Sequence, residues 1–188
     1  MKIRQPGAKI LLNDLRKDTE ESLIPLFHDW IRNNVMDDHL MIDVADYRHV
    51  PNGPGVMLIA HEAHLSVERL GGDPGLCYQS KKDVLNEASA QFEMALRHVA
   101  KAASRFISGD SSSSFQFSKR KFILLSTSRL ELKNTKEAFE KISNDVLVML
   151  EKVFGHNEFS LKQQGDSRAP FSMLVQSSKD IDWSELKD

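Results

Sequence analysis

The fold is indicated most clearly by one stretch of sequence, LMIDVADYRHVPNGPGVMLIAHEAHLSV, which occupies residues 40–67. It contains two runs of strand-forming residues, Leu40 to Val50 and Val56 to Val67, separated by the five turn-forming residues PNGPG. Prolines, glycines and asparagines favour turns because they fix or tolerate the backbone angles that a chain reversal needs. The stretch therefore predicts a β-hairpin, and its two prolines and two glycines indicate a turn of defined shape.

Patterns on either side of this hairpin predict the remaining elements. Apolar residues that recur every three to four positions predict helices from Asp18 to Asn33, Lys81 to Phe106 and Asn134 to Gly155. Shorter apolar or alternating runs predict strands at Leu76 to Gln79, Phe115 to Ser126, Glu158 to Lys162 and Pro170 to Gln176. We expect an α+β fold in which a mixed β-sheet of five to six strands packs with three main helices. A three-layer α/β/α arrangement is the alternative, because the pattern does not determine whether helices cover one sheet face or both.

Three helix and chain ends can be predicted from local chemistry. Ser80 is a good N-cap for the second helix, and Ser22 is the candidate cap of the first because Pro25 is tolerated only in a first helical turn. The tail docks on the domain through Ile181 and Trp183, or it frays.

Composition excludes several classes of protein. The 188 residues suit a single domain spanning 1–188, with 40% hydrophobic and 28% charged residues and a net charge of −2. This balance argues against nucleic-acid binding, which needs a basic face. Cys77 is the only cysteine, so no internal disulfide can form, and no apolar stretch approaches the roughly 20 residues of a membrane helix. We therefore expect a cytoplasmic protein.

The hairpin gathers an unusual set of polar side chains, whose grouping depends on the register of the two strands. If Val50 lies opposite Val56, then Asp43 and His49 share a face with His61. If Val50 lies opposite Gly55, apolar and polar groups separate better, and this second register is the preferred one.

The preferred register places Asp43 directly opposite Glu62, with His64 nearby on the same face. Two facing carboxylates need a shared proton, an arginine or a divalent cation between them. This predicts a metal site at Asp43, Glu62 and His64, with a divalent metal as the possible cofactor. The structural alternative is that both carboxylates pair with arginine or lysine from elsewhere.

Other hairpin residues are candidates for catalysis and ligand binding. His49 or His61 could act as acid or base, although a histidine among apolar neighbours is more often a core residue. Main-chain N–H groups at Asn52, Gly53 and Gly55 could bind an anion, although a stiff turn is the simpler role. The string His61-Glu62-Ala63-His64 does not match the zinc-protease signature, which needs histidines four apart on a helix.

Several motifs of the first third of the chain also resemble a group of uncharacterised bacterial proteins. They are Phe27-His28-Asp29-Trp30-Ile31, residues 42–47 and 49–51, Gly53-Pro54-Gly55-Val56 and His61-Glu62. The resemblance implies no function, but it directs attention to the same hairpin.

The sequence therefore favours a cytosolic binding or accessory protein with a small-molecule, metal or partner site on residues 42–67, and we expect it to form a homo-oligomer. A metal-assisted hydrolase or lyase is the first alternative. Its metal would be bound by Asp43, Glu62 and His64. The second alternative is a structural interaction module that uses the long helix between Leu85 and Phe106.

Overall fold

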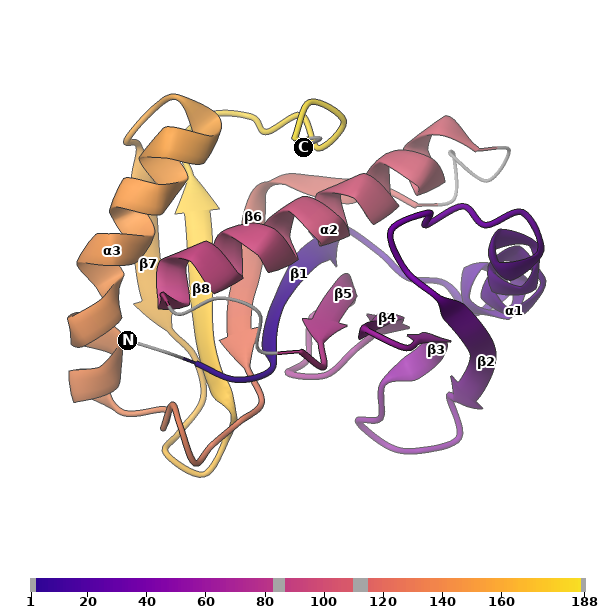
Figure 1. Cartoon of the computed structure of the whole chain (residues 1–188), viewed down its shortest axis with the longest axis horizontal. Coiled ribbons are helices and arrows are strands. Elements are labelled where there is room, and N and C mark those ends of the chain that lie inside the picture. Colours follow the sequence, from indigo (N-terminus) through magenta and orange to yellow (C-terminus); the bar gives the residue numbers. More distant parts are fainter. Residues whose placement is uncertain (1–2, 83–86, 110–114, 187–188) are drawn as a thin grey trace.

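The computed structural model describes residues 3–82, 87–109 and 115–186, and within them it shows one eight-stranded sheet with three helices (Figure 1). The strands are β1 (Pro6–Leu12), β2 (Met41–Tyr47), β3 (Gly55–Ala60), β4 (Ala63–Glu68), β5 (Gly75–Ser80), β6 (Phe117–Ser126), β7 (Phe159–Gln163) and β8 (Phe171–Ser177). The helices are α1 (Lys17–Arg32), α2 (Ala88–Ser108) and α3 (Lys136–Phe154). The expected α+β class is confirmed.

The strand order across the sheet is β2-β3-β4-β5-β1-β6-β8-β7, and the strand pairs of the sheet are antiparallel. The expectation of a mixed sheet is therefore wrong. Strands β2 to β5 follow one another through short turns, and each turn reverses the chain direction. β1 then inserts between β5 and β6, which makes it a central strand.

The sheet has eight strands instead of five to six for two reasons. The first reason is that β1 was not among the predicted strands, and its central residue is a lysine, Lys9. That lysine is buried at 2% exposure and forms an ion pair with Glu68. The second reason is that the expected strand Val56 to Val67 is two strands, since the chain reverses at His61 and Glu62 between β3 and β4.

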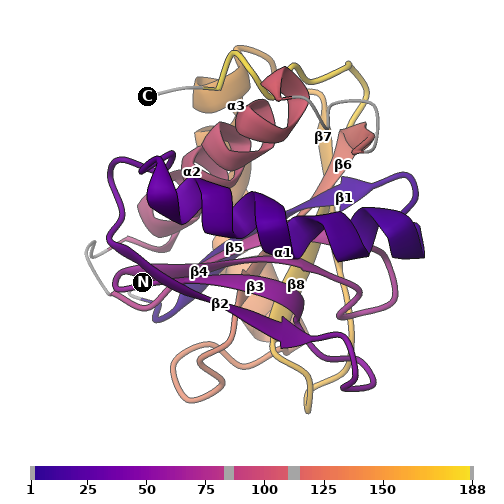
Figure 2. The ribbon, with the colours of Figure 1, turned by 90° about the vertical axis from the view of Figure 1, so that its right-hand side faces the viewer.

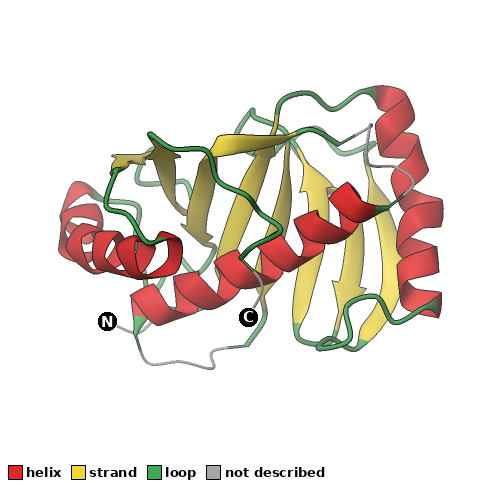
Figure 3. Ribbon diagram, turned by 90° about the horizontal axis from the view of Figure 1, so that it is seen from above, coloured by secondary structure: helices red, strands yellow, loops and turns green. Residues whose placement is uncertain are grey.

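The three helices lie on the same side of the curved sheet (Figure 3). α1 extends over the β2–β4 end (Figure 2), and its Phe27 contacts Phe106 of α2 with ring centroids 6.1 Å apart. Phe154 of α3 packs on Phe122 of β6. One row of helix-facing side chains crosses the sheet through Leu58, Leu65, Tyr78, Ala8, Leu124 and Met173. The molecule therefore has two layers, and the three-layer alternative is wrong.

The ends of the elements differ from expectation in two places. α1 continues on both sides of Pro25, so Ser22 is not its cap, and the Ser22 hydroxyl donates to the carbonyl of Thr19. Ser80 is the last residue of β5 and not the cap of α2, which begins at Ala88. Part of the expected start of this helix, residues 83–86, lies outside the described residues.

The tail docks on the domain, as the first of the two alternatives predicted. Ile181 and Trp183 are 4% and 2% exposed, and the Trp183 indole donates to the carbonyl of Ser118. In the part of the chain that the structure describes, no helix combines the length and the apolar character that membrane crossing requires.

Candidate functional site

The hairpin register differs from both registers expected from the sequence. Tyr47 pairs with Gly55 and Asp43 pairs with Ile59, so Asp43 does not face Glu62. Pairing stops at Ala60 because the chain turns there, and Glu62 lies in that turn. The predicted pair of facing carboxylates is therefore wrong.

Asp43 accepts from a backbone N–H of β2, and Asp46 from one directly after the end of this strand. The Val44 N–H donates to Asp43 Oδ1 at 2.8 Å, and Asp46 Oδ1 accepts from the Arg48 N–H at 3.1 Å. The Arg48 guanidinium also binds Asp46, and this bond lowers the pKa of Asp46 to about 2. Because β2 is an edge strand, carboxylates that occupy its N–H groups leave fewer donors for an additional strand.

Glu62 ties the β3–β4 turn to the start of β2. Its Oε2 accepts from the Leu40 N–H at 3.0 Å, and its Oε1 lies 3.1 Å from His61 Nδ1 and 3.4 Å from Lys82 Nζ. The bond from Leu40, together with His61 and Lys82, lowers the pKa of Glu62 to about 2. This carboxylate stabilises a turn.

The other predicted metal and catalytic residues are dispersed. Ile59 pairs with Asp43 on one side and with His64 on the other, so these two side chains share a face two strands apart, about 10 Å. Burial and the nearby Lys81 lower the pKa of His64. His49 is exposed beyond the end of β2.

The predicted anion-binding turn is shaped by packing. Gly55 has a φ of +64°, and a Cβ added there would lie 2.1 Å from the Val67 carbonyl oxygen. The Gly53 N–H donates to the Val50 carbonyl at 3.0 Å, so that donor is in use, and Asn52 has a φ of +55°. These contacts support a stiff turn, the alternative role for Asn52, Gly53 and Gly55.

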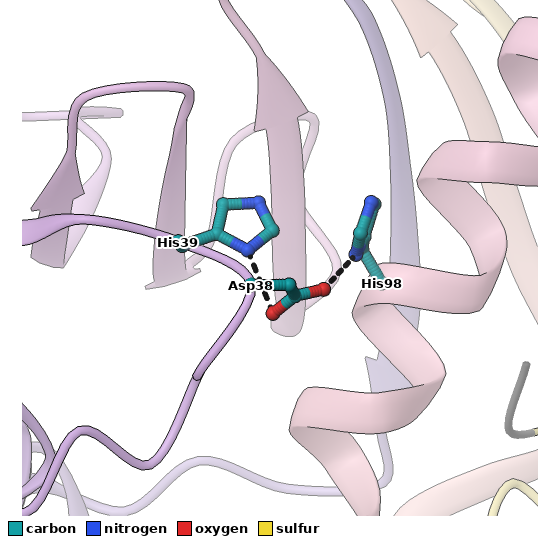
Figure 4. A group of neighbouring side chains, drawn as sticks. All are labelled: Asp38, His39 and His98. Carbon is teal, nitrogen blue, oxygen red and sulfur yellow. Dashed lines mark ion pairs between the residues drawn. The ribbon is translucent and has the colours of Figure 1, made fainter.

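The structure instead brings together Asp38, His39 and His98 (Figure 4). Asp38 lies between the two imidazole rings. Its Oδ1 is 2.9 Å from His39 Nδ1, and its Oδ2 is 3.1 Å from His98 Nδ1. One ligand atom from each residue can be chosen so that all three lie within 4.8 Å of one another. Among the described residues, this is the group of histidine and carboxylate side chains compact enough to hold a metal ion.

Three elements position this cluster. Asp38 and His39 end the connection from α1 to β2, and the aromatic side chains fix both rings. His39 Nε2 lies 2.9 Å from the Tyr78 hydroxyl on β5, and the Tyr78 ring stacks on the His98 ring at 4.8 Å between centroids. His98 comes from α2 on the helix-covered face. The hydrogen bond at His39 Nε2 directs Nδ1 of the same ring toward Asp38.

A positively charged side chain, Lys101, lies next to the cluster. Lys101 Nζ lies 2.8 Å from Asp37 Oδ1 and 3.3 Å from Asp38 Oδ1. Partial burial alone would raise the pKa of Asp38, but His39, His98 and Lys101 lower it to about 2. Burial raises the pKa of Tyr78, so its hydroxyl stays protonated at neutral pH and can donate or accept. Asp38 is therefore an anion at neutral pH, with two imidazole nitrogens facing it.

A small apolar cavity adjoins the cluster. His39 and Tyr78 line it together with Met36, Met41 and Leu58, and its volume is about 10 Å³. A cavity of roughly 10–15 Å³ holds a single water molecule. The lining of this cavity is mostly apolar and includes His39 but neither Asp38 nor His98, and the cavity is too small for an organic substrate.

Sequence reasoning missed this cluster because its parts are 60 residues apart. A usable signal exists on α2, where His98 lies three residues after the buried Ala95 and three before Lys101, next to the apolar stripe. A histidine beside a buried stripe indicates a polar partner in the core. The sequence does not say that the partner is Asp38.

No protein-family model and no curated protein sequence matches this chain. The resemblance of its first third to uncharacterised bacterial proteins stays a prediction.

Proposed function

We propose that the protein binds a divalent transition-metal ion, zinc in the first place, at Asp38, His39 and His98. The observation that carries this proposal is the presence of two imidazole nitrogens and a carboxylate oxygen within 4.8 Å of one another. Imidazole nitrogen combined with carboxylate suits zinc, iron, copper and nickel, whereas calcium and magnesium prefer oxygen ligands alone.

The surroundings of the cluster support the same proposal. Histidines that bind metal commonly donate their second ring N–H to a fixed partner, and the Tyr78 hydroxyl is in place for His39 Nε2. Zinc ligands at about 2.0–2.1 Å and tetrahedral angles lie roughly 3.3 Å apart, so the observed 2.9 Å and 3.1 Å spacings need small adjustments. A water molecule would complete four ligands, as in zinc sites with three protein ligands.

A binding role is favoured over hydrolysis. The metal-assisted hydrolase expected at Asp43, Glu62 and His64 has no comparable support. Asp43 and His64 lie two strands apart, and Glu62 is bonded to the Leu40 N–H in the β3–β4 turn. The cavity that His39 and Tyr78 line has a volume of about 10 Å³, which is too small for an organic substrate. We therefore propose a metal-binding or metal-stabilised accessory protein that works in the cytoplasm, where the single thiol of Cys77 would stay reduced.

Metal binding can be tested on protein purified without a histidine tag and stripped of metal. We expect one zinc ion per chain by isothermal titration, and a higher melting temperature on adding zinc, because a ligand bound by the folded state stabilises it. His98→Ala should weaken binding by about 10- to 100-fold or abolish it. His28→Ala, on the exposed face of α1, is the matched control and should bind as the wild type does. A melting temperature unchanged by zinc, manganese or iron would contradict the proposal.

Self-association remains a separate proposal. Four of the large apolar side chains that are exposed lie on or beside the edge strand β2: Leu40, Ile42, Tyr47 and Val50. Such a patch is a common feature of surfaces that contact a partner. Light scattering across a concentration series checks the expected homo-oligomer.

A further inference from the structure

The ammonium of Lys101 lies next to the proposed metal site, where its positive charge would repel a bound metal ion. It lies on α2 one turn after His98, and its ammonium contacts both Asp37 and Asp38. The Asp38 oxygen that it approaches, Oδ1, is the same atom that lies 2.9 Å from His39 Nδ1. A metal ion bound between His39 and this oxygen would therefore meet the ammonium at close range.

Two cations on one carboxylate oxygen repel each other strongly when they are partly shielded from water. The Lys101 side chain is 18% exposed, so solvent screens its charge only in part. Asp37 is an alternative ion-pair partner for the ammonium. Its side chain is 67% exposed and already lies 2.8 Å from Lys101 Nζ, closer than Asp38 does.

We propose that Lys101 is a built-in competitor of the metal, and that Asp37 is the partner which accepts its ammonium when the metal binds. This inference rests on the proposed metal binding at Asp38, His39 and His98. In the metal-free protein, Lys101 neutralises Asp38. In the metal-bound protein, the ion binds Asp38 and the Lys101 ammonium pairs with Asp37 alone. The metal affinity therefore depends on how strongly Lys101 pairs with Asp38 compared with Asp37.

The competition predicts opposite effects for two substitutions. Lys101→Met keeps a chain of similar length without the charge, so zinc should bind about tenfold more tightly or better because a like charge is removed from beside the ion. Asp37→Asn leaves Lys101 with Asp38 as its carboxylate partner in this cluster, so zinc should bind several-fold more weakly. Lys101→Arg keeps the positive charge and is the matched control, with an affinity close to that of the wild type.

Zinc titrations against a chromophoric chelator would measure these affinities on tag-free, metal-stripped protein, with folding checked by circular dichroism. Tighter binding by Lys101→Met and weaker binding by Asp37→Asn would support the competition. If all variants bind zinc with the wild-type affinity, the role of Lys101 is wrong while metal binding stands. If neither the wild type nor any variant binds zinc, metal binding itself is wrong. Asp37 is exposed, so its variant decides the question even where Lys101→Met does not fold.

Discussion

Lys9 Nζ lies 3.1 Å from Glu68 Oε1 in the middle of the sheet, and the two side chains are 2% and 5% exposed. The ammonium also donates to the carbonyl of Leu70 at 2.8 Å. Removing one partner of a buried pair leaves a charge without compensation, which costs about 3–5 kcal/mol. Lys9→Met should lower the free energy of unfolding by about this amount, as measured by urea denaturation. The double variant Lys9→Met with Glu68→Leu should recover most of the loss. Equal stability of the single and double variants would contradict this account.

The same pair predicts a pH dependence with a definite sign. Burial raises the pKa of Glu68 above its usual 4.5, although Lys9 opposes this rise. A raised folded-state pKa gives stability that is present below the unfolded value and lost as pH rises through the folded value. In Lys9→Met the opposing charge is gone, so the pKa should rise further. The stability of this variant relative to the wild type should therefore fall as pH increases from about 4.5 to 7, and urea denaturation across that range would measure it.

Strand β1, which was not predicted, shows which parts of the fold can be predicted from the sequence and which cannot. Periodic apolar stripes predicted all three helices, and the PNGPG turn predicted the β2–β3 reversal, because both depend on residues close together in the chain. β1 was missed because its central lysine is made tolerable by Glu68, a partner 59 positions later. No local pattern contains that information.

The candidate site was missed for the same reason. Its residues come from a connection and a helix that only the packing of α2 on the sheet brings together. The carboxylates that the sequence pattern selected, Asp43 and Glu62, satisfy backbone N–H groups at an edge strand and beside a turn.

Asp38 gives a second pH prediction, of the opposite sign. Its pKa in the folded protein is about 2, against 3.8 for an ordinary aspartate. A lowered folded-state pKa gives stability that is present above the unfolded value and lost as pH falls through the folded value. Because the side chain is 33% exposed, solvent screening reduces this contribution to about 1 kcal/mol. The difference in stability between the wild type and Asp38→Asn should shrink by this amount between pH 4 and pH 2, as measured by urea denaturation in metal-free buffer. A difference that is constant with pH would contradict it.

Gly55→Ala tests whether the hairpin turn is fixed by packing. An added Cβ would lie 2.1 Å from the Val67 carbonyl oxygen, and the φ of +64° disfavours any side chain. Gly71→Ala is the matched control, since Gly71 has a φ of +84° but no atom within 4 Å of an added Cβ. The control should lose about 1–2 kcal/mol from backbone strain alone, and Gly55→Ala should lose clearly more. Equal losses in thermal or urea denaturation would mean that the β3–β4 contact does not restrict this position.

Tyr78→Phe separates the metal-binding proposal from a purely structural role for the cluster. The substitution removes the hydroxyl 2.9 Å from His39 Nε2 and keeps the ring that stacks on His98. If His39 binds metal through Nδ1, loss of this partner leaves the ring without its fixed orientation. Changes of this kind typically cost about 10- to 100-fold in metal affinity.

The measurement is a zinc titration of both proteins, with Tyr47→Phe on the exposed edge strand as the control that should change nothing. Tyr78→Phe should also lose about 1–3 kcal/mol of stability in metal-free buffer, since His39 keeps a buried ring nitrogen without its partner. A structural role predicts this second loss alone. A fall in stability with unchanged zinc affinity would therefore mean that Tyr78 holds His39 for packing and not for a metal.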